Sequence, residues 1–165
     1  MRKRTRYWTS IIDVMLVKRQ TRYHDSSVAE TDSVVGTQLS YWGDATEAAR
    51  SLLGDLAAEA VVVILLDGGH RVIGAARVAL GVPGQCVVFP RTVFTAALLS
   101  GAASVIMAHN HPGGGKIPSK LDWDITYRCQ EAGKILGIPF LDHIIISDDE
   151  CISMRESPNW DRGQK

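Results

Sequence analysis

The hydrophobic residues of this chain fall into short runs separated by glycine, proline and polar residues. Residues 59–66 and 104–109 are almost continuously apolar and have strand length, which predicts two central strands covered on both faces. A turn sequence, Asp67-Gly68-Gly69, follows the first run and predicts that residues 71–80 return as its hairpin partner. Further strands are predicted at 86–89, 140–146 and 151–154.

Three segments combine a helical spacing of apolar residues with recognisable ends. Asp44, with Glu47 three residues later, resembles a capping box that opens a helix over 44–57. A proline opens the second helix, over 90–100, and Ser119 precedes the third, over 120–136. Both of these end before a glycine, as many helices do.

The order of these elements predicts the fold class. Residues 7–17 are rich in β-branched and aromatic side chains and indicate a weak strand, and the polar residues 24–33 indicate a loop. The remaining elements alternate between strand and helix along the chain. This order is typical of an α/β domain with a mixed central sheet flanked by helices.

The composition is that of a globular protein, with 165 residues, of which 45% are hydrophobic and 22% charged. A chain of this length can bury a core without the help of a metal or a disulfide. Cys86, Cys129 and Cys151 are widely spaced and odd in number, which argues against a secreted disulfide scaffold and favours a reducing, cytoplasmic location. The apolar run 60–66 is too short to cross a membrane, so no membrane partner is expected.

Charge is balanced over the whole chain but not along it. Eighteen basic residues match eighteen acidic ones, yet residues 1–24 carry a formal charge of +6 and the remainder −6. A basic N-terminal arm of this kind can contact nucleic-acid phosphates, although a solvated terminus is the simpler interpretation. The candidate nucleic-acid contacts are Arg2, Lys3, Arg4 and Arg6.

One segment carries the most chemical information: His109-Asn-His111, then seven residues, then Ser119-x-x-Asp122. Residues two apart on a strand point to the same side, so the two imidazoles can converge on one metal ion. The glycines at 113–115 let the chain fold back, and the next helix presents Ser119 and Asp122 on one face. Asp122 can then supply an oxygen ligand and leave a fourth position for water, as in catalytic zinc sites.

Each part of this pattern also has a structural interpretation. Ser-x-x-Asp is typical of a helix cap, a role that Ser119 can combine with catalysis. A hydrolytic site further needs a carboxylate that accepts a proton without binding the metal, and Glu59 is the candidate. It stands at the head of a buried strand, where a carboxylate is costly to bury unless it is paired; the alternative is a solvated residue at the strand end.

Glu59, His109-Asn-His-Pro112, Pro118-Ser-Lys-Leu-Asp122 and Leu141-Asp-His-Ile-Ile-Ile146 together resemble the RadC-like branch of the JAB/MPN (JAMM) metalloprotease superfamily. The resemblance covers roughly residues 44–155 and implies the three-layer, cytidine-deaminase-like architecture of that superfamily. Residues 1–43 would then form a basic arm with a strand and a loop, and residues 156–165 a tail.

The resemblance also implies a chemistry. One zinc ion per chain would be bound by His109, His111 and Asp122, with a water molecule activated by Glu59 and a tetrahedral intermediate assisted by Ser119. The implied activity is that of a peptidase or isopeptidase, and the implied substrate a peptide or a conjugate of a ubiquitin-like protein. Residues expected to support the ligands are Asn110, Asp142 and His143; the last two are also readily explained as packed strand residues.

Two departures from the family pattern bear on the alternatives. Pro112-Gly113-Gly114 replaces the usual Pro-Ser-Gly, which loosens the loop but removes no ligand. Residues 1–43 lack the paired helical pattern of the helix-hairpin-helix module found in full-length RadC relatives, which disfavours a DNA-repair role. A nucleic-acid-associated protein and a non-catalytic MPN interaction module are the two alternatives to a hydrolase.

Overall fold

The fold is seen in a computed structural model that describes residues 34–53, 56–80, 88–112, 115–147 and 150–164. Five strands form one sheet in the order β2-β1-β3-β4-β5. Only the β3–β4 pair is parallel, so the sheet is mixed, and β1 and β2 form an antiparallel hairpin. The predicted mixed sheet and the predicted hairpin are therefore both confirmed. The strands are β1 (Ala60–Leu66), β2 (Val72–Leu80), β3 (Ser104–Asn110), β4 (Phe140–Ile146) and β5 (Cys151–Ser153).

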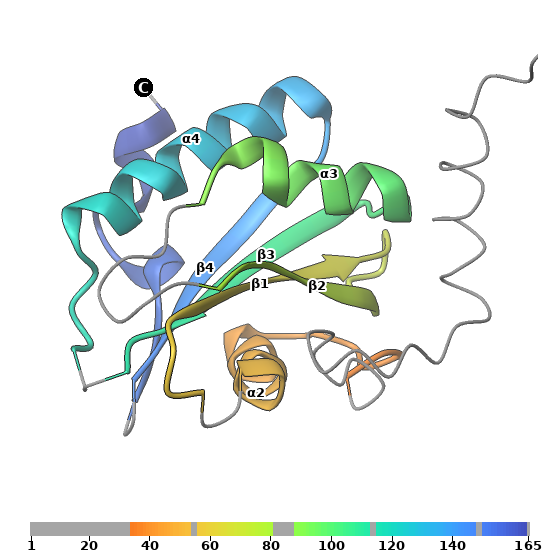
Figure 1. Ribbon diagram of the computed structural model, residues 1–165. Helices are drawn as coiled ribbons and strands as arrows, with labels where there is room; N and C mark the ends of the chain where they lie inside the picture. The colour runs from red at the N-terminus through yellow and green to blue at the C-terminus, as the bar shows by residue number, and fades with distance from the viewer. Residues whose placement is uncertain (1–33, 54–55, 81–87, 113–114, 148–149, 165) are drawn as a thin grey trace, which may run out of the picture.

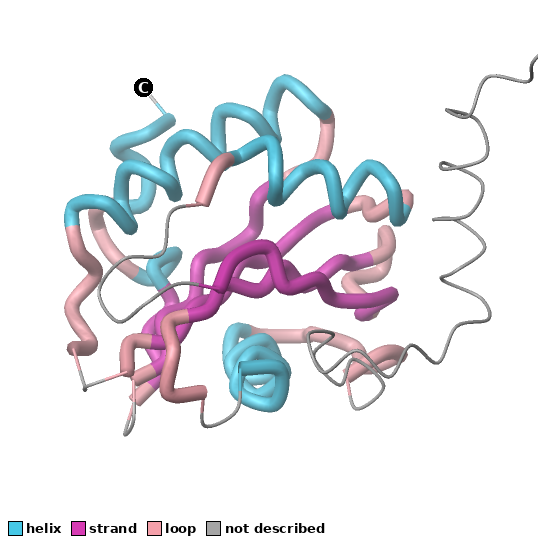
Figure 2. Tube along the Cα trace, viewed as in Figure 1, coloured by secondary structure: helices cyan, strands magenta, loops and turns pink. Residues whose placement is uncertain are grey.

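Helices cover both faces of this sheet, which confirms the predicted α/β architecture. Helix α2 (Trp42–Leu53) lies against one face, and α3 (Pro90–Ser100) and α4 (Lys120–Leu136) lie against the other (Figure 1). The tube view shows the same three layers, with the strands in the middle (Figure 2). Two short helical turns, η2 (Met154–Glu156) and η3 (Trp160–Gln164), follow β5.

Burial of both faces explains the continuous apolar run of β1. All seven residues of β1 are buried. Its even-numbered residues belong to the core under α2, and its odd-numbered residues to the core under α3 and α4. On β3, Met107 belongs to the second core, so His109, two residues further along the strand, is directed to the α4 side.

The ends of α3 and α4 follow the sequence signals. Helix α3 begins at Pro90, and each helix is followed by a glycine with a positive φ of 67°. A glycine adopts this conformation without the steric penalty that a side chain would bring. The ends of these two helices thus depend on backbone chemistry that is legible in the sequence.

The prediction for α2 was wrong in its register. The helix begins at Trp42 and ends at Leu53, rather than spanning 44–57. The carboxylate of Asp44 accepts hydrogen bonds from the backbone N–H groups of Ser40 (2.7 Å) and Tyr41 (3.3 Å). Asp44 therefore occupies the third helical position of the cap, the position that the sequence analysis gave to Glu47.

The strand predicted at 86–89 is also not observed, as far as its residues are described. Val88 and Phe89 are irregular and lead directly into α3, and residues 86 and 87 lie outside the described residues. The strand predicted at 7–17 and the loop at 24–33 lie outside them as well. Pro90 is the first residue of α3, so Phe89 is the residue that caps this helix and is not part of a strand.

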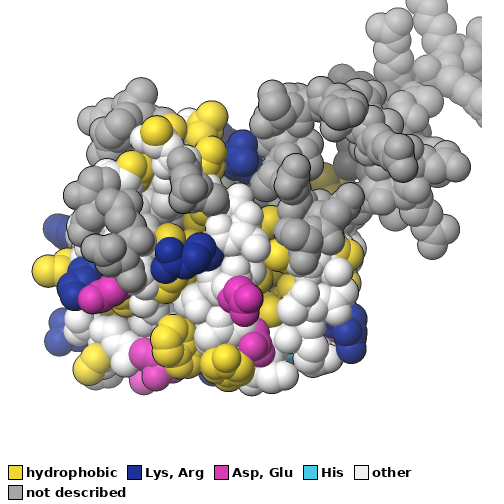
Figure 3. All heavy atoms as spheres, turned by 90° about the horizontal axis from the view of Figure 1, so that it is seen from below, with side chains coloured by type: hydrophobic (Ala, Val, Ile, Leu, Met, Phe, Trp, Pro, Cys, Tyr) yellow, Lys and Arg dark blue, Asp and Glu magenta, His cyan; other side chains and the backbone are white. Residues whose placement is uncertain are grey.

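The packed unit extends beyond residues 44–155 on both sides. Val34, Leu39 and Trp160 are buried in its cores. Figure 3 views the α2 side of the molecule, where acidic, basic and hydrophobic side chains lie next to one another. None of the helices in the described part of the chain is long and apolar enough to cross a membrane.

Gly133 gives a direct test of the packing between α4 and the sheet. A Cβ atom at this position would lie 2.6 Å from the carbonyl oxygen of Ile138 and 3.2 Å from the backbone nitrogen of Phe140. We expect Gly133→Ala to lower the free energy of unfolding by about 1 to 3 kcal/mol, because the backbone must move. Gly68→Ala, where the new atom meets nothing within 4 Å, should change it by less than about 0.5 kcal/mol. Urea titration measures both; equal stabilities would contradict the packing.

Candidate metal centre

The end of β3 brings two histidines together on the α4 side of the sheet. His109 is the second-to-last residue of β3 and is buried, and His111 follows the strand and is half-buried. Their Nε2 atoms lie 2.7 Å apart, with the ring centroids separated by 4.5 Å. The convergence expected from the His-x-His spacing is therefore present.

Asp122 reaches the same point from the first turn of α4. One of its oxygens, Oδ1, lies 3.3 Å from His109 Nε2, and the other, Oδ2, lies 3.8 Å from His111 Nε2. Oδ2 also accepts hydrogen bonds from the backbone N–H (2.7 Å) and the hydroxyl (2.6 Å) of Ser119. The capping box thus holds the carboxylate in place and leaves Oδ1 free to face His109.

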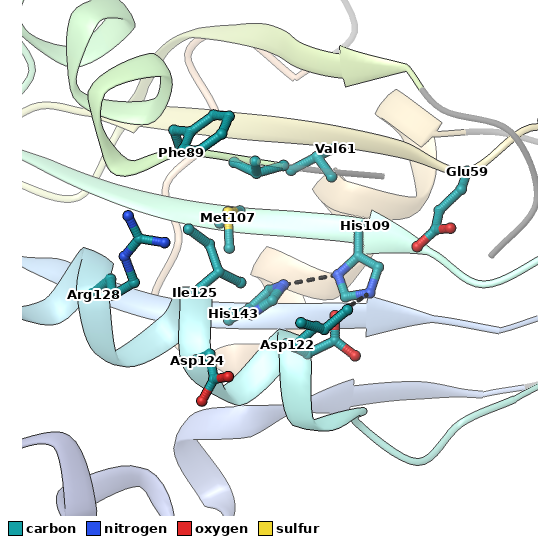
Figure 4. Close-up of a pocket in the computed structure, with 12 residues that line it drawn as sticks. Glu59, Val61, Phe89, Met107, His109, Asp122, Asp124, Ile125, Arg128 and His143 are labelled. Atoms are coloured by element: carbon teal, nitrogen blue, oxygen red, sulfur yellow. Dashed lines mark hydrogen bonds and ion pairs between the residues drawn. The ribbon is translucent and has the colours of Figure 1, made fainter. Parts of the chain in front are cut away.

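Glu59 approaches from the segment just before β1. One of its carboxylate oxygens and one ring nitrogen of each histidine all lie within 4.8 Å of one another. Its side chain makes no hydrogen bond or ion pair with any residue that the structure describes, and it points toward His109 (Figure 4). A half-buried carboxylate without a partner is available to accept a proton.

Asn110 explains how Glu59 is positioned. Its side-chain oxygen accepts a hydrogen bond from Ala60 N (2.7 Å), and its amide group donates to the carbonyl oxygens of Leu56 (2.9 Å) and Ala58 (3.0 Å). These contacts bracket Glu59 on both sides in the sequence. Asn110 therefore fixes the backbone that carries Glu59 and does not contact the imidazoles itself.

His143, on β4, forms a hydrogen bond with the ring nitrogen of His109 that faces away from His111 and Asp122. Its Nε2 lies 2.8 Å from His109 Nδ1, and its Nδ1 lies 2.7 Å from the hydroxyl of Thr126 on α4. That hydroxyl donates to the carbonyl oxygen of Asp122 (2.6 Å), so it can only accept from His143. His143 Nδ1 therefore carries a proton, which leaves its Nε2 as an acceptor for the Nδ1–H of His109.

This chain of hydrogen bonds fixes the tautomer of His109, and a carbonyl group does the same for His111. With its proton on Nδ1, neutral His109 has a lone pair on Nε2. The Nδ1 of His111 contacts the carbonyl oxygen of Gly115 at 2.5 Å and must donate to it, so in the neutral tautomer of His111 the lone pair lies on Nε2. With both imidazoles in these neutral tautomers, two nitrogen lone pairs are directed toward each other beside the Asp122 carboxylate, an arrangement suited to hold a cation.

The protonation states favour the same conclusion. Burial lowers the pKa of His109 from 6.5 to about 4; the Asp122 carboxylate opposes this effect and His111 adds to it. Burial also lowers the pKa of His143 well below its usual value. His109 and His143 are thus neutral at pH 7, and the neutral form of His109 is the one that can bind a metal ion.

The donor set fits zinc. Two imidazole nitrogens and one carboxylate oxygen form a common three-residue set in catalytic zinc sites. The partners behind each ligand fix its orientation, as is usual for metal-binding histidines. The end of β3 therefore carries a cluster of histidine and carboxylate side chains that could hold a metal ion.

Thr126 can be tested separately from the ligands. Thr126→Val keeps the shape of the side chain but removes the oxygen that accepts a hydrogen bond from His143 Nδ1. Without this acceptor, the proton of His143 can move to Nε2, and His109 then no longer needs to carry its proton on Nδ1. We expect the dissociation constant for zinc to rise about tenfold or more. Thr126→Ser keeps the hydroxyl and should stay within about threefold of the original value. Competition with a chromophoric chelator measures both; equal affinities for the Val and Ser variants would show that the hydroxyl does not set the tautomer.

The other predicted residues lie elsewhere. The Asp142 carboxylate accepts hydrogen bonds from Ser153 Oγ (2.6 Å) and from the backbone N–H groups of His143 (2.7 Å) and Arg155 (3.1 Å). Burial raises the pKa of Asp142, and these contacts join β4 to β5 and η2. Its side chain is therefore not part of the centre. The proposed nucleic-acid contacts Arg2, Lys3, Arg4 and Arg6 lie outside the described residues.

A cavity of about 220 Å³ adjoins the centre, and no pattern in the sequence predicts it. Thr126 was also not identified as a supporting residue. Its position four residues after Asp122, on the same helix face, is a sequence signal that links it to the site. The cavity walls include apolar side chains from β1, β3, α4 and the entry to α3: Val61, Val88, Phe89, Met107, Leu121 and Ile125.

Comparison with known proteins identifies the family to which the chain belongs. The model of the RadC-like JAB domain matches residues 39–160. A UPF0758 protein from Pelobacter propionicus is 48% identical over 104 residues, which are 63% of this chain and 45% of that protein. One from Staphylococcus epidermidis is 37% identical over 135 residues, which are 82% of this chain and 60% of that protein. The chain thus spans about half the length of these relatives, and their names state no activity.

Proposed function

Because the chain belongs to the RadC-like JAB domain family, we propose that it is a zinc-dependent hydrolase that cleaves peptide or isopeptide bonds. The observation that carries the proposal is the convergence of His109, His111 and Asp122 beside the Glu59 carboxylate, which has no partner among the described residues. Three ligands and a separate carboxylate are the components that hydrolysis of an amide by metal and general base requires.

His109, His111 and Asp122 would hold the zinc ion. When bound, zinc polarises a carbonyl group and lowers the pKa of water toward about 7. The chain supplies the remaining functions. Burial lowers the pKa of His109 to about 4, which keeps this ligand unprotonated near pH 7.

Glu59 would act as the general base. Its carboxylate would take a proton from the attacking water and pass it to the nitrogen of the leaving amine. The clamp of Asn110 on Leu56, Ala58 and Ala60 keeps this carboxylate at the site while leaving both oxygens free of hydrogen bonds from described residues. A base held in place and not otherwise occupied is effective because its geometry requires no reorganisation.

Ser119 would stabilise the negative oxygen that develops on the substrate. In the structure its hydroxyl donates to Asp122 Oδ2, which also accepts the backbone N–H of Ser119. If the Ser119 hydroxyl rotates toward a substrate, Asp122 Oδ2 still accepts the hydrogen bond from the backbone N–H of Ser119. The rotation therefore does not leave the Asp122 carboxylate without a partner. Donors of this kind contribute about 3 kcal/mol of transition-state stabilisation.

The proposal is tested with zinc-loaded protein and a panel of matched substrates, in which the same residues are joined by a peptide bond or by a lysine isopeptide bond. We expect hydrolysis of at least one class, loss of activity after chelation, and recovery on addition of one equivalent of zinc. Activity that persists in protein verified to be metal-free, or zinc-loaded protein that cleaves neither class, would overturn the proposal.

A further inference from the structure

The cavity beside the metal centre is polar at one end and apolar along its walls. Glu59, His109 and Asp122 line it at the metal centre, and Phe89 and Arg128 line it at the other end (Figure 4). Between these ends the walls are formed by apolar side chains of β1, β3 and α4. A substrate bound at the metal centre therefore has a defined groove into which its neighbouring residues can extend.

The far end of this groove is positively charged. Arg128 is exposed and, among the residues that the structure describes, forms no ion pair or side-chain hydrogen bond. Arg91 is not part of the cavity lining, but it lies next to Phe89, with its guanidinium carbon 5.4 Å from the centre of the ring. Asp124 also lines the cavity, but its carboxylate points away from Arg128 (Figure 4). An arginine without a partner at the end of a groove is suited to bind a carboxylate.

Helix geometry gives the separation of the two ends along the axis of α4. Asp122 and Arg128 are six residues apart on α4, which corresponds to a rise of about 9 Å along the helix. An extended peptide covers about 3.3 Å per residue. A peptide lying along α4 with its scissile amide at the metal centre would therefore place its third residue from that amide beside Arg128.

We propose that this groove selects peptides that carry a carboxylate about three residues from the scissile bond, with apolar side chains between the two. The inference rests on the proposed function, which places the scissile bond at the metal centre. The carboxylate can belong to an Asp or Glu side chain or to the terminus of the peptide, since Arg128 offers the same donors to both. The apolar walls at Val61, Met107 and Ile125 would accept the intervening side chains.

The test uses zinc-loaded protein and sets of fluorogenic peptides that differ at one position, three residues from the scissile bond, on either side of it. The residue there is Glu, Gln or Lys, and a further pair ends at that position with a free carboxylate or an amide. We expect kcat/KM to be about tenfold higher for Glu than for Gln in at least one of the two directions, and lowest for Lys. Preference for the free carboxylate over the amide, without preference for Glu over Gln, would identify the peptide terminus as the source.

Arg128→Gln should remove this preference by lowering kcat/KM for the Glu peptide to about that for the Gln peptide, because the charged contact is lost. Lys134→Gln is the matched control, since it removes one positive charge from an exposed position on the same helix. It should leave the preference unchanged. A preference that survives in Arg128→Gln, or that Lys134→Gln removes equally, would overturn the assignment.

Binding measured without turnover separates this inference from the proposed function. Labelled Glu and Gln peptides are titrated with wild-type protein and with Arg128→Gln, and fluorescence anisotropy gives their dissociation constants. Tighter binding of the Glu peptide by wild type alone supports the groove even if no peptide is cleaved, in which case only the proposed function fails. Cleavage or binding without any preference for a carboxylate overturns the inference and leaves the proposed function standing.

Discussion

Glu59→Gln is expected to lower turnover by about 10² to 10⁴-fold while zinc stays bound. Glutamine keeps the shape of the side chain and one oxygen acceptor, but it cannot take a proton from water. The three proposed ligands are unchanged in this variant, and Asn110 still fixes the backbone on both sides of residue 59. Turnover of the best substrate and the zinc content of the same preparation are measured together.

Asp122→Asn supplies the contrasting variant. The Asp122 carboxylate lies 3.3 Å from His109 Nε2 and accepts two hydrogen bonds from Ser119, so it is placed to bind the metal directly. A neutral amide is a poorer ligand for a cation, and this variant should therefore lose zinc affinity as well as activity. The two acidic residues are thus assigned opposite effects on metal content.

Two results would contradict this assignment. Glu59→Gln protein that binds no zinc would make Glu59 a ligand, which its position within 4.8 Å of the two imidazoles permits sterically. Glu59→Gln protein with zinc and undiminished turnover would place the general base elsewhere. A non-catalytic interaction module predicts no turnover in the first place, so wild-type activity is the necessary reference.

The parts of the fold that could be predicted are those set by local chemistry. Burial on both faces makes β1 continuously apolar, and the proline at residue 90 and the glycines at 101 and 137 set helix ends. The start of α2 was misplaced because Asp44 fits two positions of a helix cap, and the sequence does not distinguish them. The choice between these two cap positions depends on tertiary packing, which involves residues far away in the sequence.

The candidate site divides in the same way. His109 with His111, and Ser119 with Asp122, are close in sequence, so strand and helix spacing predict how each pair is presented. The support for these residues depends on register between distant segments. His143 reaches His109 because Met107 on β3 is paired with His143 on β4, and Asn110 reaches residues more than fifty positions earlier in the chain. No spacing rule contains this information.

The groove toward Arg128 shows a further limit of sequence interpretation. Arg128 lies on α4 at a spacing that places it on the same side as Leu121 and Ile125, which is legible once the helix is known. That this side of α4 faces a cavity depends on how Phe89 enters α3 and on the packing of β1 and β3. Specificity therefore becomes visible only when the strands and helices are assembled.

Removal of either histidine ligand is expected to abolish stable zinc binding. His109→Ala and His111→Ala each leave two of the three proposed ligands, and we expect affinity to fall by at least about 100-fold in both. Zinc per chain after dialysis against a weak chelator measures this loss. His70→Asn is the control, because His70 is exposed, lies outside the centre and has a positive φ of 59° that asparagine tolerates. It should keep one zinc per chain.

The two variants should differ in stability without metal, because the two histidines differ in burial. His109 is only 3% exposed and pairs with His143, so His109→Ala leaves a cavity and a buried acceptor without a donor. We expect a loss of about 2 to 4 kcal/mol in the free energy of unfolding. His111 is half-buried, and its replacement should cost less than about 1 kcal/mol. Full zinc occupancy in either variant would exclude that histidine as a ligand, whereas zinc loss with equal stabilities would contradict only the role of His109 in the core.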